Sequence, residues 1–223
     1  MYKLIINMKT YEESFANNAL KLAKVVDDLY EEALKRNVEI ILCPQIIDIK
    51  EILKTGVKVY SQHIDDEKFG AHTGHIIPEE LKRLGVKGTL ISHSEDMDNL
   101  DEIKSKIEIA RNLGLETCVC ARDDVIAGQI ANFEPNYIAV EPKELIGGDI
   151  SISTANPDLI KRSLEAVDDC KLLVGAGVKN QEDVKIAIKM GCKGILVASG
   201  VVKAKNPKEE ILDLLKGFEI EEK

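Results

Sequence analysis

Hydrophobic residues gather along the chain in eight short runs at fairly even spacing. The runs are nearly continuous in Val, Ile and Leu rather than alternating with polar residues, which is typical of strands covered on both faces, as in a parallel sheet. They occupy residues 3–7, 38–43, 57–62, 88–92, 116–120, 137–141, 171–175 and 194–198. We therefore expect eight buried, parallel strands.

Between these runs, apolar residues recur every three or four positions, as they do over residues 18–36 and 99–114, and this spacing predicts amphipathic helices. Several residues are typical of helix boundaries: Gly85, Gly114 and Gly191 as ends, Asn156-Pro157 and Asn180 as starts. A strand–helix unit of about 28 residues, repeated eight times, predicts an α/β fold with a single (β/α)8 barrel domain over residues 1–223. A doubly wound open sheet is the alternative, but such sheets usually have fewer strands.

Composition narrows the class of protein. The chain has 223 residues, of which 44% are hydrophobic, enough for one sizeable core. Its formal charge of −9 argues against a nucleic-acid partner, although a local basic pocket could hold a small anion. No apolar run approaches the roughly 18 residues of a membrane span, and the N-terminus lacks the zones of a signal peptide. We expect a cytoplasmic protein that acts on a small molecule, without a membrane partner.

The five cysteines form no disulfide framework or zinc-site spacing. Cys118 and Cys120 sit inside an apolar segment, which favours buried, reduced thiols.

Polar residues and glycines follow most of the predicted strands. In a (β/α)8 barrel the active site is built at the carboxyl ends of the strands, so these residues are candidates for chemistry. In chain order they are Asn7, Lys9, Gln45, His63, His93, Ser94, Glu95, Glu141, Gly175, Ala176, Gly177, Ala198, Ser199 and Gly200.

Three of the candidates, Lys9, His93 and Glu141, could together move protons beside an oxyanion. A carboxylate can abstract a proton next to a carbonyl, an imidazole can polarise that carbonyl, and an ammonium can offset the developing negative charge. Aldose–ketose isomerisation requires all three tasks. An isolated Glu or Lys at a strand end is better explained as a solvated or ion-paired surface group, but all three residues at strand ends of one barrel favour a site.

The glycine-rich stretches "VGAGV" (174–178) and "VASGVV" (197–202) present backbone N–H groups at the ends of the seventh and eighth strands. Barrels frequently bind phosphate there, which predicts a phosphorylated substrate. The alternative is that these glycines only form tight turns.

Several motifs resemble the triosephosphate isomerase family, in particular its short archaeal form. They are "INMKTY" (6–11), "GAHTGH" (70–75), "GTLISHSE" (88–95), "YIAVEPKELIG" (137–147), "GAGV" (175–178) and "GILVASGVVKAKNP" (194–207). They follow the family's order and cover nearly the whole chain. The resemblance implies a TIM barrel that interconverts glyceraldehyde 3-phosphate and dihydroxyacetone phosphate through an enediolate, in glycolysis and gluconeogenesis, without a metal or organic cofactor.

The resemblance also implies roles for individual residues. Asn7 and Lys9 would bind substrate, with Lys9 stabilising the oxyanion. His93 would be the neutral electrophile, supported by Ser94 and Glu95, and Glu141 the catalytic base. The substrate-binding set would further include Ile146, Gly147, Gly175, Ala176, Gly177, Ala198 and Ser199.

A lid would begin at Pro142, with Ile146 closing over the carboxylate and Leu196 facing it. The family's lid reads I-G-T-G, whereas this chain has Gly148 and Asp149 at the last two positions. Residues 96–99, "DMDN", are acidic where the family usually has basic residues. Both departures add negative charge near a site for a dianion, so a barrel that binds, or isomerises, a different small sugar phosphate is the alternative function.

The "GAHTGH" stretch has two possible roles. In the resembled family this loop, with Thr73 at its tip, reaches into a neighbouring subunit, which implies a homodimer or homotetramer. His72 and His75 could instead be metal ligands, but no third ligand is obvious from the sequence, so we expect no metal site.

Overall fold

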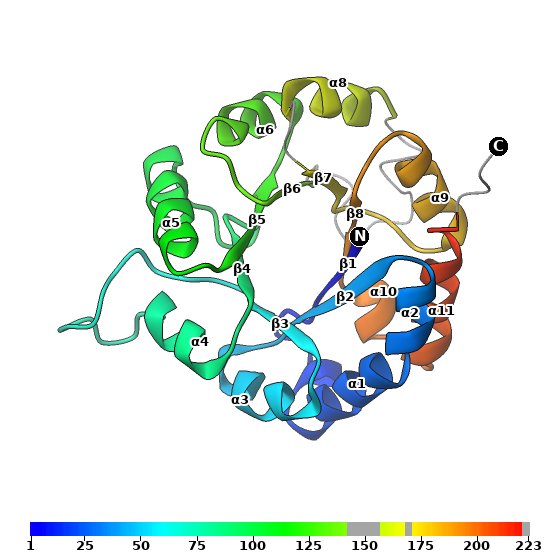
Figure 1. Ribbon diagram of the computed structural model, residues 1–223, viewed down its shortest axis with the longest axis horizontal. Helices are drawn as coiled ribbons and strands as arrows, with labels where there is room; N and C mark the ends of the chain where they lie inside the picture. Colours follow the sequence, from blue (N-terminus) through cyan, green and yellow to red (C-terminus); the bar gives the residue numbers. More distant parts are fainter. Residues whose placement is uncertain (142–156, 168–170, 220–223) are drawn as a thin grey trace.

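In the computed structural model, eight parallel strands close into a barrel that helices surround (Figure 1). The structure describes residues 1–141, 157–167 and 171–219. The strands are β1 (Tyr2–Asn7), β2 (Val38–Cys43), β3 (Lys58–Ser61), β4 (Gly88–Ile91), β5 (Glu116–Ala121), β6 (Tyr137–Val140), β7 (Lys171–Val174) and β8 (Gly194–Val197). They pair in chain order, and β8 pairs with β1. The closed barrel confirms the predicted fold class and rules out the open sheet.

The helices lie outside the barrel. They are α1 (Asn17–Asp28), α2 (Tyr30–Lys35), α3 (Ile49–Ile52), α4 (Pro78–Leu84), α5 (Leu100–Asn112), α6 (Asp124–Ala131), α8 (Pro157–Val167), α9 (Gln181–Lys189), α10 (Ser199–Val202) and α11 (Pro207–Lys216), with short 3-10 helices at Glu12–Ser14, Ile46–Asp48 and Leu53–Thr55. None of the helices in the described part of the chain has the length and apolar character needed to cross a bilayer.

The helix expected over residues 18–36 is in fact two helices, because the hydrogen-bond ladder is interrupted at Leu29. Its backbone N–H bonds the carbonyl of Val26, three residues back, at 3.1 Å. The helix expected over residues 99–114 is present as α5. Asn99 caps it with a reciprocal pair of hydrogen bonds, its side chain accepting from the N–H of Glu102 while Glu102 accepts from the N–H of Asn99.

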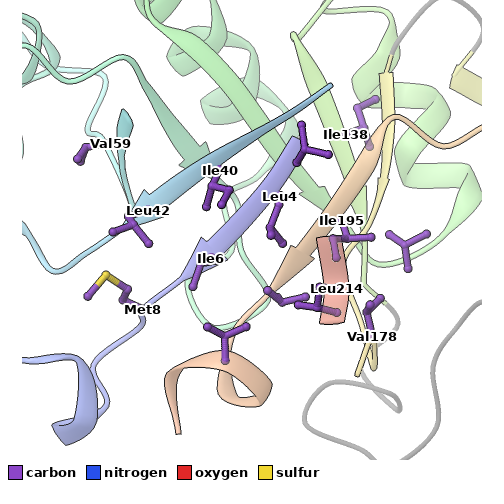
Figure 2. Close-up of a cluster of buried hydrophobic side chains, with 14 of the residues drawn as sticks. Leu4, Ile6, Met8, Ile40, Leu42, Val59, Ile138, Val178, Ile195 and Leu214 are labelled. Carbon is purple, nitrogen blue, oxygen red and sulfur yellow. The ribbon is translucent and has the colours of Figure 1, made fainter. Parts of the chain in front are cut away.

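Both faces of the strands are apolar, as their continuous hydrophobic runs predicted. In β1, Ile5 points into the barrel and packs against other inward-facing residues such as Ile41 and Leu196. Its neighbours Leu4 and Ile6 point outward into the larger core between the strands and the helices (Figure 2). Burial of this double core fixes the positions from which the strand ends project their polar residues.

The amino end of the barrel is closed by an ion-pair network. The Lys58 ammonium lies 2.8 Å from a Glu39 carboxylate oxygen and 2.6 Å from one of Glu116. Lys3 also pairs with Glu39, and the Tyr60 hydroxyl donates to Glu116. Polar groups at this end of a barrel contribute to stability, whereas chemistry belongs to the opposite end.

Candidate active site

A cavity of about 680 Å³ opens at the carboxyl ends of the strands. Of the residues predicted from strand ends, it brings together Lys9 after β1, His93 and Glu95 after β4, and Glu141 after β6. The segments after β7 and β8 also line it; their lining residues include Gly175, Ala176, Gly177, Ala198, Ser199 and Gly200. Proton-transfer groups and glycine-rich backbone therefore share one cavity.

Lys9 is held in a strained backbone conformation. Its φ of 47° lies in the left-handed region, which costs a non-glycine residue about 1 to 3 kcal/mol. Two side chains hold it there: the Asn7 side-chain oxygen accepts from the Lys9 N–H at 3.0 Å, and the Gln62 amide donates to the Lys9 carbonyl at 2.9 Å. Gln62 also donates to the Cys43 carbonyl at 2.9 Å, which ties the ends of β1, β2 and β3 together.

The Lys9 ammonium pairs with Glu95 inside the cavity mouth. Its Nζ lies 2.7 Å from Glu95 Oε1, and the Lys9 side chain is only 9% exposed whereas that of Glu95 is 59% exposed. The lysine is thus mostly desolvated while its partner remains in contact with water. An anion entering the cavity would meet a cation whose present partner can move into solvent.

His93 is buried and oriented by the chain that follows it. The backbone N–H of Glu95 lies 3.2 Å from His93 Nδ1. A backbone amide can only donate, so we assign Nδ1 as the acceptor and the ring proton to Nε2. Burial lowers the pKa of His93, and the nearby charge of Lys9 lowers it further, against an opposing effect of Glu95 and Asp96. The site therefore favours a neutral imidazole whose N–H points into the cavity.

Glu141 is almost completely buried, with 2% of its surface exposed. Its Oε2 lies 3.5 Å from His93 Nε2, and none of the described residues offers that oxygen a hydrogen bond. Burial raises the pKa of Glu141 to about 8, although a hydrogen bond from Cys120 and the charge of Lys9 act in the opposite direction. A carboxylate with a raised pKa and a free oxygen is suited to accept a proton from a substrate.

Gly175 makes room for that carboxylate. A Cβ atom at this position would lie 2.4 Å from Glu141 Cγ and 2.8 Å from Oε1. The crowded atoms all belong to the buried Glu141 side chain, so a Cβ at this position would displace the carboxylate. The glycine after β7 therefore has a positioning role in addition to any contact that its backbone makes with a ligand.

The remaining predicted residues lie elsewhere or outside the described chain. Asn7 is buried beneath Lys9, and Ser94 lines a second cavity of about 220 Å³ next to Cys120 and Glu141. Gln45 and His63 are not among the described residues that line the main cavity, whereas Leu196 is. Predictions for the lid fall outside the described residues; they concern Pro142, Ile146, Gly147, Gly148 and Asp149.

Sequence reasoning missed three residues of this region. Gln62 was counted as the last residue of a strand, yet its amide holds the Lys9 backbone. Tyr11 and Lys203 both line the cavity, and the Lys203 ammonium lies 4.3 Å from the centre of the Tyr11 ring. Lys203 comes shortly after the second glycine-rich stretch, so a count of cations near the predicted phosphate site could have found it.

Comparison with known proteins identifies the family. A family model described as triosephosphate isomerase matches residues 3–217. The chain belongs to the triosephosphate isomerase family. This confirms the resemblance that the sequence motifs indicated.

Relatives within the family cover nearly the whole chain. The triosephosphate isomerase of Methanocaldococcus jannaschii is 45% identical over 218 residues, which span 96% of this chain and 98% of that protein. The triosephosphate isomerase of Methanoculleus marisnigri is 40% identical, over 95% of this chain and 96% of its own length. That of Methanopyrus kandleri is 39% identical, over 97% of each chain.

Proposed function

We propose that this chain interconverts glyceraldehyde 3-phosphate and dihydroxyacetone phosphate through an enediolate, and that residues 1–223 act as one domain. Family membership supports the substrate class. The observation that carries the proposal is the convergence of Glu141, His93 and Lys9 on one cavity, with the Glu141 carboxylate buried against the His93 ring.

In this mechanism Glu141 removes the proton from the carbon beside the substrate carbonyl and returns it to the neighbouring carbon. His93, neutral and protonated at Nε2, donates to the oxygen that becomes negatively charged, and Lys9 offsets that charge. The lowered pKa of His93 supports the neutral electrophile, and the raised pKa of Glu141 supports efficient proton exchange near neutral pH. The glutamate–neutral histidine pattern is the known mechanism of this family, and the geometry described above is compatible with it.

The substrate phosphate would lie against the glycine-rich segments that follow β7 and β8. Gly177 and Ser199 line the cavity on that side, where backbone N–H groups can donate to an anion. Lys203 adds positive charge to the same cavity in a chain whose net charge is −9. Ile146 and Gly147 would complete the site from the lid.

The alternative is that the barrel binds, or isomerises, another small sugar phosphate. The sequence feature in its favour is Asp149, which replaces a glycine of the family's lid and adds negative charge. Charges separated by several ångströms at an effective dielectric of about 20 interact by roughly 1 to 4 kcal/mol, enough to weaken phosphate binding. Replacing Asp149 with glycine should then lower KM for triose phosphates several-fold.

A coupled assay in both directions, comparing the parent protein with Glu141→Gln, tests the proposed activity. We expect turnover of both triose phosphates by the parent and a loss of at least about 10²-fold in kcat in the variant, with substrate binding little changed. Binding of triose phosphates without turnover by the parent would support a binding protein instead. Turnover confined to another sugar phosphate would support the alternative isomerase.

We also propose a homodimer or homotetramer. Large apolar side chains are exposed in the connections that follow the first four strands: Phe15, Ile46, Ile47, Phe69 and Met97 are between 44% and 64% exposed. Exposed apolar side chains on these connections would be covered in an assembly. Light scattering should give a mass of at least two chains, and a fully active monomer would contradict the proposal.

A further inference from the structure

The loop between β3 and α4 carries a cluster of three potential metal ligands. It extends away from the barrel (Figure 1) and includes Glu67, His72 and His75. One donor atom from each residue lies within 4.8 Å of the donors of the other two. The two histidines lacked a third ligand in the sequence, and folding of the loop brings Glu67 to them from the opposite arm.

The spacing of these donors suits a small divalent ion. An ion bound tetrahedrally at about 2.0 to 2.1 Å from each donor would hold neighbouring donors about 3.4 Å apart. Glu67 Oε2 and His72 Nε2 are already 3.4 Å apart. The His72 and His75 ring centres are 5.7 Å apart, so a modest rotation of the His75 side chain is the main adjustment that an ion would require.

Hydrogen bonds within the loop hold its backbone in place, so the three potential ligands are carried on an ordered segment. At its base, the Asp65 N–H donates to the Ile76 carbonyl at 3.0 Å, and the Ile76 N–H donates to the Asp65 carboxylate at 2.5 Å. Near its tip, the His75 N–H donates to the His72 carbonyl at 3.1 Å. These bonds fix both arms and the turn between the two histidines, which lowers the entropic cost of gathering three ligands.

A second carboxylate lies near one of the ligands. Asp65 Oδ1 lies 3.7 Å from His75 Nδ1. Histidines that bind metals commonly direct their second nitrogen towards a carboxylate, which fixes the ring orientation and increases its basicity. With Nδ1 facing Asp65, the Nε2 atom of His75 remains for an ion. Asp65 is itself held by the Ile76 N–H, and its Oδ1 also lies 3.3 Å from His63 Nε2.

From this geometry we propose that Glu67, His72 and His75 bind a divalent transition-metal ion of the Zn²⁺ type, with water as the fourth ligand. Two imidazoles and one carboxylate form a ligand set that Zn²⁺ accepts readily. The ion would join the Glu67 arm of the loop to the arm that carries both histidines, with Thr73 between them. This site lies outside the catalytic cavity, and its occupancy does not depend on the proposed isomerase activity.

The test is a Zn²⁺ titration of the tag-free, full-length protein in competition with a chromophoric chelator. Cys170 is replaced by serine throughout, because it lies outside the described residues and a thiol could bind zinc. We expect one ion per chain. Co²⁺ should give the intense visible absorption of a tetrahedral site.

Variants identify the ligands. His72→Asn, His75→Asn and Glu67→Gln should each weaken binding at least about 10-fold. The matched control is Glu80→Gln, an exposed carboxylate nearby on α4, which should leave the affinity unchanged. Circular dichroism verifies that each variant is folded.

Two results would overturn the proposal. One is the absence of stoichiometric Zn²⁺ binding to the assembled, folded protein, whether or not it isomerises triose phosphates. The other is equal affinity in the parent and in the double variant of His72 and His75. Isomerase activity measured in the same samples separates failure of this site from failure of the proposed function.

Discussion

The buried carboxyl group of Glu141 should destabilise the folded protein as pH rises. Its pKa is about 8 in the folded state and 4.5 when unperturbed. Below pH 4.5 the group is protonated in both the folded and the unfolded state, so its ionisation does not affect the free energy of unfolding. Between these two values the unfolded chain loses the proton while the folded chain keeps it, so stability falls as pH increases. Above pH 8 the full penalty is present, because the folded state must also hold a buried charge.

The size of this loss of stability follows from the pKa shift of Glu141. Each pKa unit corresponds to about 1.4 kcal/mol, so a displacement from 4.5 to about 8 implies a penalty of roughly 4 to 5 kcal/mol. Glu141→Gln keeps the size of the side chain but cannot ionise. We therefore expect the variant to match the parent near pH 4.5 and to exceed it by a few kcal/mol near pH 9.

Urea unfolding followed by circular dichroism across this pH range measures the effect. Both proteins must be compared at one concentration, because an assembly makes apparent stability depend on it. A difference between variant and parent that stays constant from pH 4.5 to pH 9 would refute the reasoning, since it would place the origin of the change in packing rather than in ionisation.

Three further substitutions test the arrangement of the site. Gly175→Ala should lower kcat about 10²-fold, because the new Cβ would lie 2.4 Å from Glu141 Cγ; a crystal structure with an undisturbed carboxylate would argue against this. Gln62→Ala should reduce kcat/KM about 10-fold by releasing the strained lysine backbone, and unchanged kinetics would remove its positioning role. Lys203→Met should raise KM for triose phosphates several-fold. Lys205 does not line the cavity, so Lys205→Met should leave KM unchanged; equal effects of the two substitutions would show that Lys203 makes no specific contribution to phosphate binding.

Much of the fold could be predicted because its main determinant is local. The eight apolar runs matched the strands to within one residue at every end, since a strand buried on both faces leaves a continuous hydrophobic signal. The interruption at Leu29 could not be predicted in this way. Leu29 is itself buried, so the helical spacing of apolar residues continues through the point where the hydrogen-bond ladder breaks.

In the candidate site, too, residues marked by a local sequence pattern could be predicted, whereas contacts between distant segments could not. Lys9, His93 and Glu141 could be found because strand ends of a barrel meet at one edge. The role of Gln62 depends on the left-handed backbone of Lys9, 53 residues away along the chain, and no local pattern encodes that contact. Likewise, the third potential ligand of the loop, Glu67, becomes a neighbour of His72 only after the loop folds back on itself.

The central claim is that Glu141 transfers a proton between two carbons of a triose phosphate. Proton NMR of dihydroxyacetone phosphate in D₂O tests it directly, since it reports isomerisation and exchange of carbon-bound hydrogen without coupling enzymes. We predict that the parent protein forms glyceraldehyde 3-phosphate and incorporates deuterium at carbon, and that Glu141→Gln does neither at a comparable rate while still binding the substrate. Deuterium incorporation by the glutamine variant at the parent rate would contradict the assignment of Glu141 as the base.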